Sequence, residues 1–162
     1  GPSVSQMLIG FLKDQDDRVR ANAVEALSNV GELTDAEAII PCLYDKNNRV
    51  RANTVITLWR LGYYQIYEPV LEMLRHPDKW MRASAAFALG EIKDSRFMPV
   101  LIQCLRDPDA DVRRNVIQSL GKISDALSLA PYIKPLRFDP DEGVRRAVSD
   151  ILAAAIKAKS KA

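Results

Sequence analysis

One motif recurs five times along this chain at an almost constant spacing. Its clearest copy is DPDADVRRNVIQSLGKI, which begins at Asp107. The other copies begin at Asp14, Asp45, His76 and Asp139. The motif arginine returns after 31 residues, and after 32 at the last step, at Arg20, Arg51, Arg82, Arg113 and Arg145. A fixed period of this length is typical of helical arrays in which no unit buries its apolar face alone. The period therefore predicts a stack of similar units.

Each copy has the pattern of two helices joined by a short loop. The first helix carries apolar residues at helical spacing before a charged stop, as in VLIQCLRD over residues 100–107. The second helix follows a residue that can cap it, and one column supplies these caps: Asp16, Asn47, Asp78, Asp109 and Asp141. Short loops make paired helices antiparallel. We expect an all-α fold, a right-handed α-solenoid of five helical hairpins.

Small residues share another column of the second helices. Ser28, Gly90 and Gly121 occupy it in three repeats, whereas Trp59 stands there in the second repeat. Small side chains let neighbouring helices approach closely. We expect a local adjustment around Trp59.

The motif resembles the short HEAT-like repeat, a type also found in phycobilin lyase subunits. The resemblance rests on an Asp, a capping Asp or Asn two residues later, Val-Arg, an Ala-rich turn and Leu-Gly, and it covers residues 3–157. It implies a ladder of charge-assisted hydrogen bonds between repeats, in which an Arg fork reaches a carboxylate at the turn. The expected ladder residues are Asp14, Arg20, Asp45, Arg51, Arg82, Asp107, Arg113, Asp139 and Arg145.

The third repeat departs from the ladder pattern. His76, the single histidine of the chain, replaces the ladder Asp. We expect the ladder to be interrupted at Arg82, unless Arg82 finds an acid in an adjacent repeat. His76 is either a pH-sensitive weak point or an ordinary turn residue, and the second interpretation is favoured.

The ends of the chain and its composition suggest a piece of a larger, non-membrane protein. We expect residues 1–2 to be the remnant of a cleaved expression tag, residues 3–157 to form the repeat domain and residues 158–162 to fray. The net charge of +2 is nearly balanced, so it demands neither nucleic acid nor an acidic membrane. No apolar run approaches the roughly 18 residues of a membrane span.

The cysteines fit a reducing compartment. Cys42 and Cys104 occupy equivalent places two repeats apart, on the order of 20 Å from each other in a helix stack, which is too far for a disulfide. We expect both to pack as small apolar side chains, and a cytoplasmic location.

No catalytic motif is present in the sequence. One histidine and two distant cysteines supply neither a Ser-His-Asp triad nor a usual zinc site, and no Gly-rich phosphate loop occurs. The sequence therefore predicts a protein that is not an enzyme and binds no cofactor or metal.

The exposed side of the second helices is the candidate binding surface. Most of its positions are polar, but Ile56, Trp80 and Phe87 are apolar and Arg49 and Arg60 flank them. An apolar and aromatic patch rimmed by Arg is typical of a protein-binding hot spot. The expected partner-binding residues are Arg49, Asn53, Ile56, Arg60, Trp80, Ser84, Phe87, Asn115 and Gln118. Alternatively, Trp80 folds over the repeat junction and Phe87 tightens the curvature.

Three functions are compatible with such a surface. The favoured one is a scaffold that binds another protein or a peptide segment on a concave face lined by the second helices. Trp80, Asp111 and Arg49 superficially resemble the groove residues of HEAT-like alkylpurine glycosylases, but the balanced charge of this face neutralises phosphate poorly, so nucleic acid is an unlikely partner. The repeat type also suggests a bilin lyase-like accessory subunit.

Overall fold

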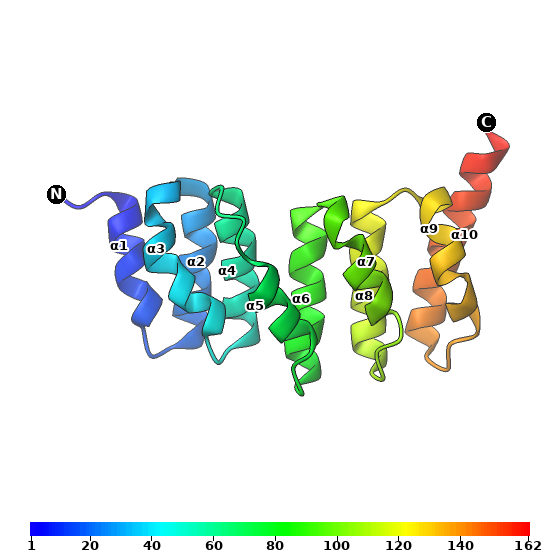
Figure 1. The fold of residues 1–162 in the computed structure, drawn as a ribbon, viewed down its shortest axis with the longest axis horizontal. Helices are drawn as coiled ribbons and strands as arrows, with labels where there is room; N and C mark the ends of the chain where they lie inside the picture. The colour runs from blue at the N-terminus through cyan, green and yellow to red at the C-terminus, as the bar shows by residue number, and fades with distance from the viewer. The chain divides into compact units, whose positions relative to one another are not determined.

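The computed structural model describes all 162 residues, and its regular structure is entirely helical. Successive helices form five hairpins, so the predicted all-α repeat fold is confirmed (Figure 1). The first helices of the hairpins are α1 (Val4–Gly10), α3 (Ala36–Ile39), α5 (Tyr67–Leu74), α7 (Met98–Cys104) and α9 (Ala126–Ile133). The second helices are α2 (Asp17–Val30), α4 (Asn48–Arg60), α6 (Lys79–Ile92), α8 (Ala110–Ile123) and α10 (Glu142–Ser160).

Five short 3-10 helices adjoin the first helices. They are η1 (Phe11–Lys13), η2 (Leu33–Asp35), η3 (Ile40–Tyr44), η4 (Ser95–Phe97) and η5 (Lys134–Phe138). Pro41 lies in η3 and Pro135 in η5. Because proline lacks an N–H and its ring clashes with the preceding turn, the α-helical pattern tightens there into a 3-10 turn.

The chain divides into two compact units, residues 1–88 and 89–162. Each unit has its own buried core. The motif leucine is fully buried twice in the first unit, at Leu27 and Leu58, and twice in the second, at Leu89 and Leu120. Burying a leucine side chain contributes roughly 2 kcal/mol, so each of these residues stabilises its repeat substantially. None of the helices combines the length and apolar character that a bilayer crossing requires.

The second helices begin where the capping column predicted. Asp16 accepts a hydrogen bond from the Arg18 N–H, and Asn47 accepts from both Arg49 and Val50. The remaining caps act in the same way, with acceptor and donor residues Asp78 and Trp80, Asp109 and Asp111, and Asp141 and Val144. Each such cap stabilises its helix by about 1 kcal/mol.

Close helix approach occurs at one member of the small-residue column. A Cβ on Gly90 would lie 2.8 Å from the Cβ and Oγ of Ser119 and 2.9 Å from its Cα, so α6 and α8 leave no room for a methyl group there. At Gly121 a Cβ would meet only the Ile151 Cδ1, at 3.7 Å. The prediction therefore holds at Gly90, whereas the structure does not require glycine at 121.

The second repeat accommodates Trp59 through an altered helix end. The Trp59 ring meets the Tyr64 ring edge-on, with centroids 4.7 Å apart. Gly62 has φ +92°, the Gly62 N–H donates to the Trp59 carbonyl and the Tyr63 N–H donates to the Leu58 carbonyl. This pair of bonds around a left-handed glycine is a Schellman motif, which ends α4 and turns the chain so that Tyr64 reaches Trp59.

Candidate functional site

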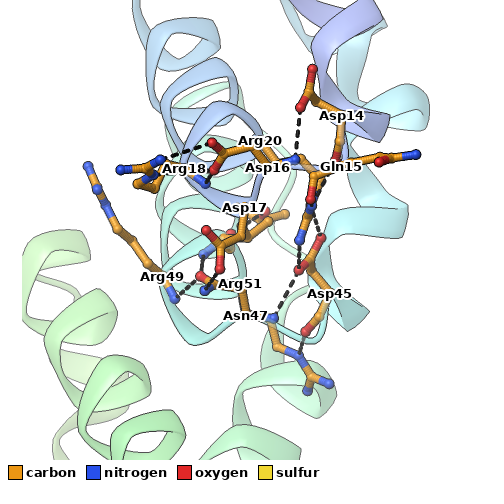
Figure 2. A network of polar contacts seen from close by, with 12 residues as sticks. Asp14, Gln15, Asp16, Asp17, Arg18, Arg20, Asp45, Asn47, Arg49 and Arg51 are labelled. Atoms are coloured by element: carbon orange, nitrogen blue, oxygen red, sulfur yellow. Dashed lines mark hydrogen bonds and ion pairs between the residues drawn. The ribbon is translucent and has the colours of Figure 1, made fainter.

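The ladder arginines join neighbouring repeats. Arg20 donates from Nε to Asp45 Oδ2 at 2.8 Å and from Nη2 to Asp45 Oδ1 at 3.1 Å, while its Nη1 donates to the Asp14 carbonyl at 2.7 Å (Figure 2). The two side chains of the ion pair are only 8% and 13% exposed. One guanidinium thus grips the turn of its own repeat and the carboxylate of the next.

The second unit repeats this geometry. Arg113 donates to the two Asp139 carboxylate oxygens at 2.8 and 2.9 Å, and its Nη1 donates to the Asp107 carbonyl at 2.8 Å. The sequence pairing of each Asp with the Arg six residues later is therefore a contact through the Asp carbonyl. The carboxylate that binds the guanidinium belongs to the following repeat.

Each ladder carboxylate also closes its own turn. Asp45 Oδ1 accepts the Asn47 N–H at 2.9 Å, and Asp139 Oδ1 accepts the Asp141 N–H at 2.9 Å. Burial by itself would raise the pKa of Asp45 and of Asp139, but the hydrogen bonds from arginine and from the turn N–H outweigh it, and the pKa of both carboxyl groups lies below its usual value.

The ladder is interrupted at Arg51, one step before the predicted position. Its next repeat offers His76 in place of an Asp, and Arg51 reaches Glu72 instead, with a single contact of 3.5 Å. Arg82 keeps the contacts to its own turn, to the carbonyls of His76 at 2.8 Å and Pro77 at 2.9 Å. The break lies at Arg51 because the ladder arginine reaches forward to the next repeat, and the expected break at Arg82 stays a prediction. The sequence reasoning also missed Glu72. The only signal for it in the sequence is that an acidic residue lies four residues, about one helical turn, before His76, which stands in place of the ladder Asp.

His76 keeps one of the two functions of the ladder Asp. Its Nδ1 accepts the Asp78 N–H at 3.0 Å, the bond that an Asp carboxylate makes elsewhere. An imidazole has no second acceptor for an arginine fork while Nδ1 is so occupied. His76 is therefore a turn residue that closes its loop without joining the repeats.

The ladder has an open position at each end. The Asp14 carboxylate accepts the Asp16 N–H at 2.8 Å and is not bound by an arginine fork. Arg145 donates from Nη1 to the carbonyls of Asp139 at 2.7 Å and Pro140 at 3.0 Å, the contacts to its own turn.

Two aromatic side chains project from the second-helix face of the first unit. Trp80 is 50% exposed and Phe87 is 43% exposed, and both lie on α6. The Lys79 ammonium lies 4.8 Å from the centre of the Trp80 ring, within the range of a cation–π contact. Ile56, the third predicted member of this patch, is only 8% exposed. It is a core residue, and its prediction as a surface contact was wrong.

The polar residues around these rings divide into two kinds. Asn53 and Ser84 are half-buried and join helices: the Asn53 side-chain amide donates to the Ala21 carbonyl at 3.0 Å, and Asn48 donates to Ser84 Oγ at 2.7 Å. Arg49 and Arg60 are exposed. Arg49 lies 3.7 Å from Glu25 across the α2–α4 pair.

The predicted residues of the second unit lie on a polar surface. The Asn115 amide donates to the Asp111 carbonyl of its own helix at 2.8 Å, while Gln118 is exposed. The Asp111 carboxylate pairs with Arg114 at 2.6 Å, so this candidate groove carboxylate already has a cation beside it. No group of three or more His, Cys, Asp or Glu side chains lies together as a metal site would require.

The repeats match a known family along the whole chain. The family model of HEAT repeats matches residues 1–59, 36–110 and 98–162. This chain belongs to the HEAT repeat family. The short repeat with its Asp and Arg columns is thus a HEAT repeat, and the resemblance drawn from the motif is confirmed. A search of curated protein sequences finds no match.

Solved structures with the same HEAT or armadillo type of fold include natural and designed proteins. A chain of the CpcE–CpcF complex of phycocyanin lyase from Nostoc sp. PCC7120 is 24% identical with a TM-score of 0.68, over 97% of this chain and 67% of that chain. A designed armadillo repeat protein in complex with the peptide (KR)4 is 17% identical with a TM-score of 0.61, over 94% and 81%. At these identities the similarity to each establishes the fold alone.

The two cysteines of this HEAT repeat protein differ in exposure. Cys42 is buried, and Cys104 is half-buried. Burial raises the pKa of the Cys42 thiol, which keeps it protonated and unreactive.

Proposed function

We propose that this HEAT repeat protein is a non-catalytic interaction scaffold, and that the second-helix face of residues 1–88 binds a protein or peptide segment. The observation that carries the proposal is the exposure of Trp80 and Phe87 on one helix. They are seven residues apart, which is two helical turns, so their side chains project from the same side of α6.

Exposed aromatic rings of this kind suit a binding centre. A Trp or Phe side chain buries about 150 to 250 Å² in a contact, and such residues dominate the energy of protein interfaces. Their conformational freedom is small, and the Lys79 contact limits that of Trp80 further. A partner that covers both rings therefore gains apolar burial at a low ordering cost.

The helices beneath this surface are already fixed to one another. The Thr57 hydroxyl donates to the Val24 carbonyl at 2.9 Å, and Asn53 and Ser84 make the inter-helix bonds described above. Asn53 and Ser84 thus support the surface, and Trp80 and Phe87 provide its contact area. A rigid surface of this kind favours binding without rearrangement.

The charges around the rings favour one kind of partner segment. Lys79 lies beside the Trp80 ring, Arg49 and Arg60 are exposed on α4, and Glu25 lies 3.7 Å from Arg49. The designed armadillo protein with a similar fold is in complex with a basic peptide, (KR)4. Charge complementarity predicts the opposite preference for this chain, an apolar segment with an adjacent carboxylate.

Neither alternative function has a site that favours it. The glycosylase-like set would use Asp111, whose carboxylate pairs with Arg114. The similarity to a phycocyanin lyase chain is one of fold, and function depends on local sites. The scaffold role is therefore the proposal that the side chains support.

The test compares three alanine variants of the full chain. Partners are captured from an extract of the source organism with the unmodified chain and with the variants Trp80→Ala, Phe87→Ala and Tyr44→Ala, and are identified by mass spectrometry. Tyr44 is the matched control because it is 57% exposed and lies on η3, in the first-helix layer. We expect the Trp80 and Phe87 variants to lose a partner that the Tyr44 variant retains.

The captured partner is then added in increasing amounts to the Trp59→Phe variant of the chain, in which Trp80 is the only indole. Binding at the rings should shift its emission, and Phe87→Ala should weaken affinity by about 30-fold, since a hot-spot residue contributes about 2 kcal/mol. Equal affinity for the Tyr44, Trp80 and Phe87 variants would show that the partner binds elsewhere.

A further inference from the structure

The last repeat contains an open groove that lies entirely within residues 89–162. It has a volume of about 590 Å³ and runs between α9 with η5 on one side and α10 on the other. Its lining consists of Leu127, Ala130, Pro131, Lys134, Arg137, Leu152, Ala155, Ile156 and Lys159.

The floor of this groove is apolar and uncovered. Leu127 is 44% exposed and Ile156 is 72% exposed. Leu152 is half-buried, whereas its counterparts in the motif column have 0% exposure: Leu27, Leu58, Leu89 and Leu120. The groove therefore lies where the other repeats bury apolar surface.

The rim of the groove is cationic at positions that are apolar in every other repeat. Lys134 stands in the column of Ile9, Ile40, Leu71 and Ile102. Arg137 stands in the column of Leu12, Leu43, Leu74 and Leu105. The third cation, Lys159, lies in the last part of α10, which is 19 residues long against 13 or 14 for the other second helices. No acidic side chain lines the groove.

One simple occupant, a second copy of the chain, leaves part of this surface unexplained. A second copy of the chain offers the exposed apolar residues of α1, Val4 and Met7, but α1 carries no charged side chain. It would leave the cationic rim without counter-charges.

We propose that this groove docks an acidic amphipathic helix of a partner protein. Apolar side chains at i, i+3, i+4 and i+7 of that helix enter the floor beside Leu152 and Ile156, and flanking Asp or Glu side chains pair with Lys134, Arg137 and Lys159. Recognition of an amphipathic helix by an apolar groove is a common mode of peptide binding, and the rim supplies charge complementarity. This site is distinct from the proposed surface on residues 1–88.

The probe is a fluorescein-labelled peptide with Leu at the four stripe positions and Glu at the flanking positions. One control peptide has the same composition in scrambled order, and a second has Lys in place of Glu. Fluorescence anisotropy with the full chain should show saturable binding of the acidic peptide and at least about tenfold weaker binding of both controls. Raising the salt from about 0.05 M to about 0.5 M should weaken the binding, because the ion pairs lie at an exposed rim.

Matched variants place the peptide on the groove. Lys134→Glu with Arg137→Glu should weaken binding at least about tenfold, while Lys46→Glu with Arg75→Glu, an equal charge change at exposed sites in the first unit, should not. Ile156→Ser should also weaken binding, whereas Val30→Ser, a change at a residue 47% exposed on α2, should not. Circular dichroism melting curves confirm that each variant is folded.

Four results would overturn the docking proposal: no binding of the acidic peptide, equal binding of all three peptides, equal affinity of the groove and control variants, or loss of peptide binding in Trp80→Ala. The last result would place the peptide on the second-helix face. Sedimentation velocity of the chain alone tests the self-association alternative, and a concentration-dependent complex abolished by Ile156→Ser would assign the groove to a second copy. Peptide binding unchanged by Trp80→Ala supports the groove whether or not the scaffold surface binds its own partner.

Discussion

Arg20 and Arg113 each divide the guanidinium between two repeats. One nitrogen bonds the carbonyl of its own turn, and the other two form a fork with the carboxylate of the next repeat, as Arg20 does with Asp14 and Asp45. The fork is largely buried and its polar groups are satisfied. Removal of one partner therefore leaves an uncompensated buried charge, which is far more costly than loss of an exposed ion pair.

Asp45→Asn and Asp139→Asn should each lower the free energy of unfolding by about 3 kcal/mol, because each leaves an arginine without its carboxylate. Asp14→Asn is the matched control, since Asp14 has the same turn bond but no arginine fork. Its cost should stay below about 0.5 kcal/mol, because an Asn side chain can also accept the turn N–H. Urea unfolding measures all three, and a cost for Asp14→Asn equal to the others would mean that the turn bond, and not the fork, stabilises the repeats.

The same carboxylates should govern the acid limit of stability. The pKa of Asp45 and of Asp139 is lowered in the folded chain, so the folded state favours the ionised form of both carboxyl groups. Their contribution is complete above the usual value of 3.8 and is lost as the pH falls through the lower folded value. Urea midpoints measured between about pH 2 and pH 6 should fall steeply below pH 3.8, and less steeply in Asp45→Asn. An equal pH dependence in the variant and the unmodified chain would exclude Asp45 as a source of this acid sensitivity.

His76→Asp should repair the ladder. An Asp at this position would accept the Asp78 N–H, as His76 does, and would also offer Arg51 a carboxylate fork. We expect a gain of about 1 to 2 kcal/mol in the free energy of unfolding. His76→Asn supplies the turn acceptor without the charge and should give little of this gain. The gain should vanish in the Arg51→Ala background, because the arginine that the new carboxylate binds is then absent. A double-mutant cycle by thermal unfolding measures this dependence.

At the scale of helices, whether a small residue is required at a position depends on how much space the neighbouring helix leaves for a side chain there. Gly90 is in contact with Ser119, whereas Gly121 in the same sequence column has space beside it. The column alone identifies both as small positions. The difference depends on how close the adjacent helix lies, which a side-chain pattern does not specify.

Gly90→Ala should destabilise the chain by about 1 to 3 kcal/mol. The new Cβ would overlap the Ser119 backbone at 2.9 Å, which outweighs the higher helix propensity of alanine. Gly121→Ala should stabilise by about 0.5 to 1 kcal/mol, because its Cβ meets only an ordinary contact. Urea unfolding of the two variants tests this, and equal effects would contradict the difference in helix spacing.

Ile56 shows the limit of a helical-face argument. It shares a column with Glu25, Phe87 and Gln118, all of which are exposed, so the period correctly predicts the side of the helix. The period does not predict how much of that side the neighbouring side chains cover, and the Ile56 side chain is only 8% exposed. The caps at Asp16 and Asn47 were predictable because the bonds that define them are local in sequence.

At the scale of the whole molecule, the period determines most of the fold that sequence reasoning predicted. It identifies five hairpins, their order and the Asp and Arg columns. It does not distinguish whether an arginine bonds the Asp six residues before it or the Asp about 25 residues after it, since both spacings recur with the same regularity. Only the structure shows that Arg20 pairs with the Asp45 carboxylate, and this also explains why the break lies at Arg51.

The two compact units should respond to mutation independently. Asp45 and Asp139 lie in different units and have different arginine partners. The double variant Asp45→Asn with Asp139→Asn should lose the sum of the single effects to within about 0.5 kcal/mol. In contrast, Arg20→Ala with Asp45→Asn should fall well short of additivity, because the two residues share one fork. Urea unfolding of both pairs provides the comparison, and a large coupling in the first pair would show that the units stabilise each other through these sites.

The forward reach of the arginine has a consequence for how such a chain can change in length. Consider the duplication of one complete period that contains both its turn Asp and its Arg. The new arginine would bind the carboxylate of the repeat that follows it, and the arginine of the preceding repeat would bind the new Asp. Every donor and acceptor would be matched again without any further mutation. The polar link between repeats is thus transferable, so the array can grow or shrink by whole modules through recombination, whereas insertion of a partial module would leave a buried charge unmatched.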